Sequence, residues 1–257
     1  YKNKKINSYY KLVCYSKGKA HLEFDKYITY DSNQLLIKNY YTSLNSGTER
    51  ASFYNLENSK LSFPYNPQAS GVGKVFKRGF NNFFKYKKGD LVFGPLSHSQ
   101  FSVKDPNQVV KLDERINLTE ASFFHLAIIA LQGIKMLDIK NDYKGEIVVI
   151  GQGVIGRITT LILRAINYRV VCVTRSDKKS KFLNEKNLII IQNNGLDKLN
   201  KIHPKYIIDA TGNNETINII MDSISKNGKI VLLGSNRGFT KNFKINNSFR
   251  LNKVSVI

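Results

Sequence analysis

The chain has 257 residues, of which 42% are hydrophobic, so it is long enough to form two domains with apolar cores. Its 40 Lys and Arg residues outnumber its 19 Asp and Glu residues, and the resulting formal charge of +21 would attract nucleic acid, anionic membranes or phosphorylated ligands. The basic clusters, however, are short, scattered and outside any nucleic-acid-binding motif. Composition therefore argues against a nucleic-acid-binding protein.

Two cysteines, Cys14 and Cys172, lie inside apolar strand-like segments, where a thiol is typically a small core residue. They indicate neither a disulfide framework nor a zinc cluster, and they fit a reducing compartment. The sequence contains no run of 18 or more apolar residues and no apolar segment of signal-peptide length near its lysine-rich start. We therefore expect a cytoplasmic protein that does not bind membranes.

The first half of the chain is predicted to be all-β, because short apolar segments alternate with turns. Glycines mark the bends, and Lys88-Gly-Asp90 is a turn signal before a strand. The expected strands span residues 9–15, 20–24, 34–41, 71–77, 90–93, 101–104 and 109–112.

One helix is expected to follow these strands and to connect the two halves. Asn117 suits its N-cap, Glu120 would complete a capping box, and apolar residues continue through Met136. The sequence therefore predicts one domain over residues 1–117 and a second over 118–257.

Residues 145–157 combine an apolar strand, a glycine-rich turn and the start of a helix. Gly151, Gly153 and Gly156 have the Gly-x-Gly-x-x-Gly spacing, which permits a tight turn, close approach of a pyrophosphate and close packing of helix on strand. The N–H groups at the helix start, including those of Val154 and Ile155, would then face the anion. The spacing also arises by chance, so an α/β domain with an incidental glycine turn is the alternative.

The segments after the glycines repeat a strand and helix rhythm, which predicts a doubly wound parallel sheet. The expected strands lie at 146–150, 169–174, 188–192, 206–211 and 229–234, and the expected helices at 156–167, 177–185 and 215–225.

The end of the second strand of this sheet indicates which nicotinamide cofactor would bind. An NAD site carries a carboxylate there, about 20 residues beyond the glycines. Here the strand ends at Thr174, Arg175 and Ser176 follow, and the first carboxylate is Asp177. A guanidinium with neighbouring hydroxyls suits a 2′-phosphate, so we favour NADP(H) over NAD(H). Alternatively, Arg175 only stacks on the adenine.

Several short stretches recur alongside the order of a β-rich domain, a connecting helix and a nucleotide-binding domain. They are Asn45-Ser-Gly-Thr-Glu-Arg50, Ser70-Gly-Val-Gly-Lys-Val75, Lys88-Gly-Asp-Leu-Val-Phe-Gly94, His98-Ser-Gln-Phe101, the glycine turn and Asp209-Ala-Thr-Gly212. This order and these stretches resemble the medium-chain dehydrogenase/reductase superfamily of alcohol and polyol dehydrogenases and quinone reductases. The Ser-Gly-Thr-Glu sequence within the first stretch is similar to the branch of bacteriochlorophyllide dehydrogenase-like oxidoreductases.

The resemblance implies a GroES-like β-rich catalytic domain followed by a Rossmann domain. Family members usually continue beyond the nucleotide-binding sheet to complete the catalytic domain, so the chain resembles a C-terminally truncated member. Further cofactor contacts are implied at Thr211, Gly212, Gly234 and Ser235. In the family a strand at the place of residues 250–257 pairs with its copy in a second subunit, which implies a homodimer.

The resemblance also bears on the catalytic residues. The positions of the family's catalytic zinc ligands hold Ser46, Pro67 and His125, and serine and proline cannot replace a thiolate and an imidazole, so we expect no zinc. Thr48 matches the family's proton-relay hydroxyl near the nicotinamide ribose. His125 is either a second functional acid or a helix residue satisfied by a backbone carbonyl.

His98 matches a position that is commonly structural, and the adjacent side chains of Glu49 and Arg50 are expected to form an ion pair. Without a metal, hydrogen-bond donors must stabilise the charge on a carbonyl oxygen during hydride transfer. We therefore expect a zinc-independent, NADP(H)-dependent oxidoreductase acting on a small-molecule ketone, alcohol or activated alkene. The alternatives are a dehydrogenase of a larger hydroxyalkyl or sugar-like substrate and a nucleotide-binding or structural protein without turnover.

Overall fold

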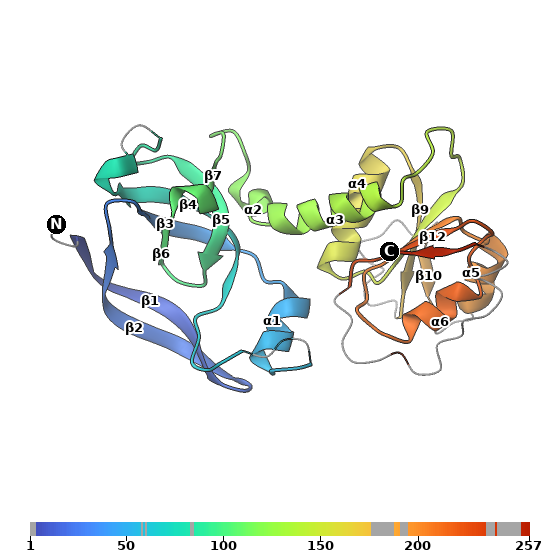
Figure 1. Ribbon diagram of the computed structural model, residues 1–257, viewed down its shortest axis with the longest axis horizontal. Coiled ribbons are helices and arrows are strands. Elements are labelled where there is room, and N and C mark those ends of the chain that lie inside the picture. The colour runs from blue at the N-terminus through green and yellow to red at the C-terminus, as the bar shows by residue number, and fades with distance from the viewer. Residues whose placement is uncertain are drawn as a thin grey trace. The chain divides into compact units, whose positions relative to one another are not determined.

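The structure is a computed structural model that describes residues 4–57, 59, 61–82, 85–175, 188–190, 195–234, 240 and 253–257 (Figure 1). The chain divides into two compact units, one ending at His125 and the other starting at Leu126. The domain boundary expected from the sequence, after residue 117, lies shortly before this division. Each unit is described separately below.

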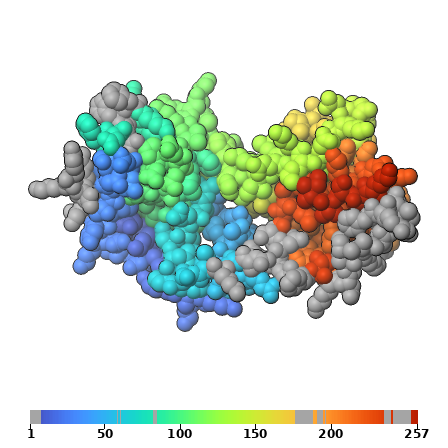
Figure 2. Space-filling view, viewed as in Figure 1, coloured from blue at the N-terminus to red at the C-terminus, as the bar shows by residue number. Residues whose placement is uncertain are grey.

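The first unit contains a β-hairpin and a five-stranded antiparallel sheet with the strand order β6-β3-β4-β5-β7. Backbone hydrogen bonds tie the hairpin to neighbouring loops: Leu12 donates to the carbonyl of His98 over 2.8 Å, and Cys14 and Tyr65 exchange two bonds. Figure 2 shows the hairpin (blue) lying against the rest of this unit. Each strand expected here is present: β1 (Lys4–Ser16), β2 (Lys19–Tyr30), β3 (Leu35–Thr42), β4 (Gln68–Arg78), β5 (Leu91–Ser97), β6 (Phe101–Lys104) and β7 (Val110–Lys111).

The expectation that this half is all-β is wrong at helix α1 (Ser46–Phe53). The side chain of Asn45 caps the helix by accepting from the N–H of Thr48, while the Glu49 carboxylate accepts from the N–H of Asn45 over 2.7 Å. These reciprocal bonds satisfy N–H groups that a helix start leaves without partners. Ala51 is its only buried residue, so the helix has no apolar stripe that periodicity could detect.

The single helix expected from residue 117 is two helices, α2 (Leu118–Ala121) and α3 (Phe124–Met136). Asn117 is the N-cap as predicted, because its side chain accepts from the N–H groups of Thr119 and Glu120. The interruption lies at Ser122. Its hydroxyl donates to the carbonyl of Thr119 over 2.7 Å, and its own carbonyl accepts from the hydroxyl of Ser70. These bonds compete with the helical pattern and end α2.

The second unit contains the predicted doubly wound parallel sheet, with the strand order β10-β9-β8-β11-β12-β13. The first strand of this unit, β8, lies at the centre, and the order reverses beside it, which is the arrangement of a Rossmann fold. The strands are β8 (Glu146–Ile150), β9 (Arg169–Thr174), β10 (Leu188–Ile190), β11 (Tyr206–Asp209), β12 (Lys229–Leu232) and β13 (Ser255–Val256).

Helices cover both faces of this sheet, because β8 is apolar on both sides. Val148 and Ile150 belong to one core cluster, and Ile147 and Val149 belong to another. Helices α5 (Leu196–Ile202) and α6 (Thr216–Met221) pack into the first cluster, and α3 and α4 (Val154–Ala165) into the second. The sequence did not predict α5, and the helix expected at 177–185 lies outside the described residues. No helix in the described ranges has the length and apolarity needed to cross a membrane.

The packing of α4 gives a stability prediction with a matched control on the same helix. Leu163 is fully buried, whereas Leu161 is 65% exposed. We expect Leu163→Ala to lower the free energy of unfolding by about 2–5 kcal/mol, because it removes buried methyl groups and leaves a cavity. Leu161→Ala should change it by less than about 0.5 kcal/mol. Urea unfolding measures both values, and equal losses would contradict the assignment of the buried face.

Candidate nucleotide-binding site

The candidate site lies where the strands of the second unit end. Because the strands are parallel, the loops that follow β8, β9, β11 and β12 leave the sheet along one edge. The N–H of Gly151 donates to the carbonyl of Val173 over 2.8 Å, and the N–H of Ala210 donates to that of Ile150 over 2.8 Å. Of the residues predicted from the sequence to bind the cofactor, those that the structure describes therefore lie along this edge.

The three glycines of the turn have different steric surroundings. Gly151 has a φ of +88°, and a side chain there would also lie 2.7 Å from Thr211. A Cβ at Gly156 would lie 1.8 Å from the carbonyl oxygen of Gly151, so the first turn of α4 fits against the strand end only without a side chain. A Cβ at Gly153 would meet nothing within 4 Å. The geometry matches the tight turn, close packing and open approach expected of these positions.

The start of α4 is suited to an anion. Gly153 is the N-cap, and the first turn contains no acidic residue. The N–H groups of Val154, Ile155 and Gly156 have no acceptor within the helix, and the helix dipole places partial positive charge there. Together with the space above Gly153, this chemistry fits a pyrophosphate.

Gln152, which the sequence did not single out, is buried within the turn and only 2% exposed. Its side-chain N–H donates to the carbonyl of Val149 over 3.1 Å, which fixes the orientation of the amide. Its Oε1 atom is buried and has no hydrogen-bond partner among the described residues. A hydroxyl donor on a ligand would satisfy this oxygen. A glutamine between two motif glycines gives no sequence signal for such a role.

Asp209, at the end of β11, organises the neighbouring loops. It is 1% exposed, and burial raises the pKa of its carboxyl. Its side chain accepts from the N–H of Thr211 over 2.8 Å, and its carbonyl accepts from the N–H groups of Leu233 and Gly234. A Cβ on Gly234 would lie 2.1 Å from the backbone nitrogen of Gly212. The predicted positions Thr211, Gly212 and Gly234 are thus in contact, whereas Ser235 lies outside the described residues.

The end of β9 carries the residues that were predicted to select the cofactor. Val173 pairs with Ile150, so β9 ends beside the glycine turn. Thr174 is 5% exposed and belongs to the core of the sheet, whereas the side chain of Arg175 is exposed and accessible to an anion. Ser176 lies outside the described residues.

The predicted catalytic residues belong to the first unit. Thr48 is exposed in the first turn of α1, and His125 is exposed at the second position of α3. Ser46 begins α1, and Pro67 is buried just before β4, where its carbonyl accepts from the N–H of His98. Within the described ranges, no three His, Cys, Asp or Glu side chains gather closely enough to hold a metal ion.

The carboxylate of Glu49 bonds to His98, and the expected ion pair between Glu49 and Arg50 is therefore corrected. The His98 Nε2 atom lies 2.9 Å from Glu49 Oε2, and His98 Nδ1 lies 2.7 Å from the hydroxyl of Thr42. The side chains of His98 and Glu49 are only 10% and 21% exposed. Successive helix residues point about 100° apart, so Glu49 can face the sheet while Arg50 faces water. Three separate segments supply this chain of bonds, so no local motif reveals it.

No protein-family model matches the chain. One curated relative, a Bacillus subtilis protein that carries the name NADP-dependent oxidoreductase YfmJ, is 33% identical over 105 residues. This match covers 38% of the chain and 30% of the relative. The matched region is therefore less than a third of the relative's length.

Solved structures match nearly the whole chain. An alcohol dehydrogenase from Thermotoga maritima has a TM-score of 0.83 at 13% identity, with 97% of this chain and 84% of that chain covered. Benzyl alcohol dehydrogenase from Acinetobacter calcoaceticus has a TM-score of 0.81 at 15% identity, with 98% and 83% covered. A zinc-binding dehydrogenase from Sinorhizobium meliloti, bound to NADP, has a TM-score of 0.76 at 14% identity, with 98% and 84% covered. The antiparallel sheet, the six-stranded parallel sheet and these neighbours together show that the chain has the fold of these dehydrogenases, with a GroES-like domain followed by a Rossmann domain.

Proposed function

We propose that the chain is an NADP(H)-dependent, zinc-independent oxidoreductase that transfers hydride between nicotinamide and a small-molecule ketone, alcohol or activated alkene. The observation that carries the proposal is the start of α4, where Gly153 leaves open space beside N–H groups that have no acceptor within the helix. The name of the Bacillus subtilis relative and the NADP bound to the Sinorhizobium meliloti structure support the choice of cofactor.

Different residues of the second unit would bind different parts of this cofactor. The N–H groups of Val154, Ile155 and Gly156 would hold the pyrophosphate, and Arg175 would pair with the 2′-phosphate. Thr211, Gly212 and Gly234 would line the site, with Ser176 and Ser235 as further proposed contacts. When bound, NADP(H) supplies or accepts the hydride.

Thr48 and His125 are the residues that we propose act on the substrate. Both side chains are exposed, and each can donate a hydrogen bond to an oxygen that gains charge. The zinc positions of the family hold Ser46 and Pro67, which provide no thiolate or imidazole, so these donors would replace a Lewis acid. Conjugated substrates such as enones and quinones need less polarisation and suit such a site best.

Arg175 tests the cofactor preference. We expect NADPH to bind more tightly than NADH, and Arg175→Ala to weaken NADPH about tenfold or more while leaving NADH nearly unchanged, because a charge-assisted hydrogen bond to the 2′-phosphate is lost. Lys226→Ala is the control, since this exposed lysine precedes β12 and lies at the opposite edge of the sheet. Calorimetry measures all affinities. Equal binding of both cofactors by the unmodified chain would refute the assignment.

Thr48 tests the catalytic proposal. NADPH oxidation should be measured with ketones, enones and quinones, with and without a chelator. We expect Thr48→Val to lower kcat by about 10²–10⁴ with any accepted substrate, because it removes the hydrogen-bond donor, and Thr48→Ser to restore most of the rate. The chelator should have no effect. Loss of activity with the chelator would overturn zinc independence, and NADPH binding without turnover would identify a nucleotide-binding protein.

We also propose a homodimer through β13, the edge strand of the parallel sheet. The N–H groups of Ser255 and Ile257 donate to the carbonyls of Gly228 and Ile230, so the N–H of Val256 points to the open side, where a second copy could pair. Val256→Pro removes that donor and keeps the bonds to β12, and a chain ending at Phe249 removes the strand. Sedimentation equilibrium should show a dimer for the full chain and monomers for both variants. Unchanged dimers in both would exclude this edge.

A further inference from the structure

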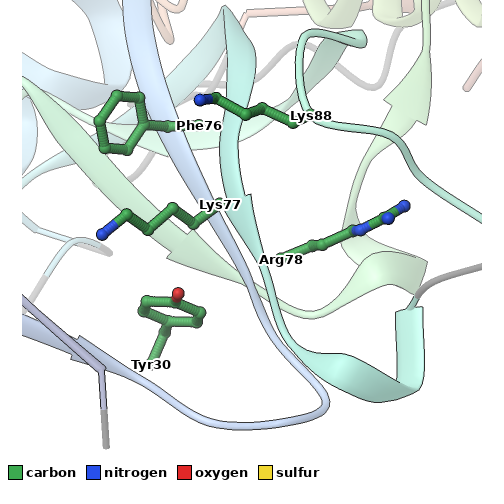
Figure 3. Close-up of a pocket in the computed structure, with 5 residues that line it drawn as sticks. All are labelled: Tyr30, Phe76, Lys77, Arg78 and Lys88. Carbon is green, nitrogen blue, oxygen red and sulfur yellow. The ribbon is translucent and has the colours of Figure 1, made fainter.

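A second candidate site lies in the first unit, in a pocket that the proposed oxidoreductase function does not use. The pocket has a volume of about 440 Å³ and is lined by Tyr30, Phe76, Lys77, Arg78 and Lys88 (Figure 3). These residues come from the end of β2, the end of β4 and the turn before β5. The volume lies within the range of about 300–1,000 Å³ that is typical of small-molecule sites.

Three consecutive residues of β4, Phe76, Lys77 and Arg78, line the pocket, and a β-bulge explains why they do not simply alternate between the faces of the sheet. Leu36 pairs with Lys77 and Ile37 pairs with Val75, so Phe76 is an extra residue in the pairing of β3 with β4. Bulges of this kind redirect side chains that would otherwise alternate between the faces of a sheet. The Lys77 ammonium accordingly lies 5.9 Å from the centre of the Phe76 ring.

The charge of the pocket favours an anion. Three of its five lining residues are cationic and none is acidic. Arg78 donates to the carbonyl of Tyr86, whereas neither Lys77 nor Lys88 forms an ion pair within the part of the chain that the structure describes. Figure 3 shows the ammonium of Lys88 directed toward Phe76, with Lys77 between the rings of Phe76 and Tyr30. A ligand with two negative charges would suit this pair of lysines better than a neutral one.

Tyr30 provides an independent indication of a ligand. It is 4% exposed, and its hydroxyl is buried without a hydrogen-bond partner among the described residues. Burial also raises the pKa of this hydroxyl, so it remains a donor at neutral pH. Buried hydroxyls normally have partners, and this hydroxyl is able to donate to an acceptor on a ligand. An oxygen of an anion bound beside Lys77 would fill that role.

We propose that this pocket binds a small phosphate monoester that carries a planar ring. The phosphate would contact Lys77 and Lys88 and accept from the Tyr30 hydroxyl, since charge-assisted hydrogen bonds to phosphate are strong. The ring would pack against Phe76, whose own ring is held by an edge contact with Phe101 at 5.4 Å. The site is separate from the glycine turn, which belongs to the other unit, so it does not depend on the proposed NADP site.

Phenyl phosphate is the probe for this site, and calorimetry of the full chain gives its affinity. We expect saturable binding that Lys77→Ala and Lys88→Ala each weaken about tenfold or more, because each removes a charge-assisted hydrogen bond. Tyr30→Phe should weaken binding several-fold. Lys87→Ala is the matched control: it removes the same charge one residue away, from an exposed side chain that does not line the pocket. Both pocket lysines are exposed, so these variants should keep the parent melting temperature.

Three outcomes would overturn the proposal. The first is that phenyl phosphate does not bind saturably to the unmodified chain. The second is that Lys87→Ala weakens binding as much as Lys88→Ala does, which would indicate diffuse attraction by a basic surface. The third is that inorganic phosphate binds as tightly as phenyl phosphate, which would show that the ring contributes nothing.

Discussion

The contact between Gly156 and the carbonyl of Gly151 is the constraint on which the second unit depends. A Cβ at Gly156 would lie 1.8 Å from the carbonyl oxygen of Gly151, so only glycine lets α4 begin directly at the end of β8. That close start places the first N–H groups of the helix, which have no acceptor within it, at the carboxyl edge of the sheet. The same turn contacts Thr211, which Asp209 holds through its side chain, so one steric restriction aligns the loops that follow β8 and β11.

The first unit uses hydrogen bonds in place of steric restriction to position its candidate residues. Glu49 accepts from His98 and from the N–H of Asn45, and it therefore ties the start of α1 to the β-sheet region. Thr48 lies in the same first turn. Its orientation thus depends on a histidine distant in sequence, and His98, expected to be structural, supports the helix that carries the proposed proton donor.

Much of the fold could be predicted because its signals are local. The continuous β-branched apolar run of β8 and the spacing of Gly151, Gly153 and Gly156 predict a buried strand, a turn and a helix within a short segment. Helix α1 could not be predicted in this way, because polar caps stabilise it and no apolar stripe marks it. The interruption between α2 and α3 at Ser122 could not be predicted either, because the hydroxyl that donates to its carbonyl belongs to Ser70, in β4. The same holds for the candidate functional residues. A sequence motif predicts the glycine turn, whereas Gln152 and the Thr42–His98–Glu49 contacts are recognised only in the three-dimensional structure.

The buried carboxyl of Asp209 links protonation to the integrity of the site. Its pKa is raised by burial, so the folded chain binds this proton more tightly than the unfolded chain does. The associated stability is fully present below the ordinary pKa of an aspartate and is lost as the pH rises through the raised value. Above that raised value the ionised group therefore costs free energy at the point where the loops after β11 and β12 meet. Local opening at this edge of the sheet should consequently become easier as the pH rises.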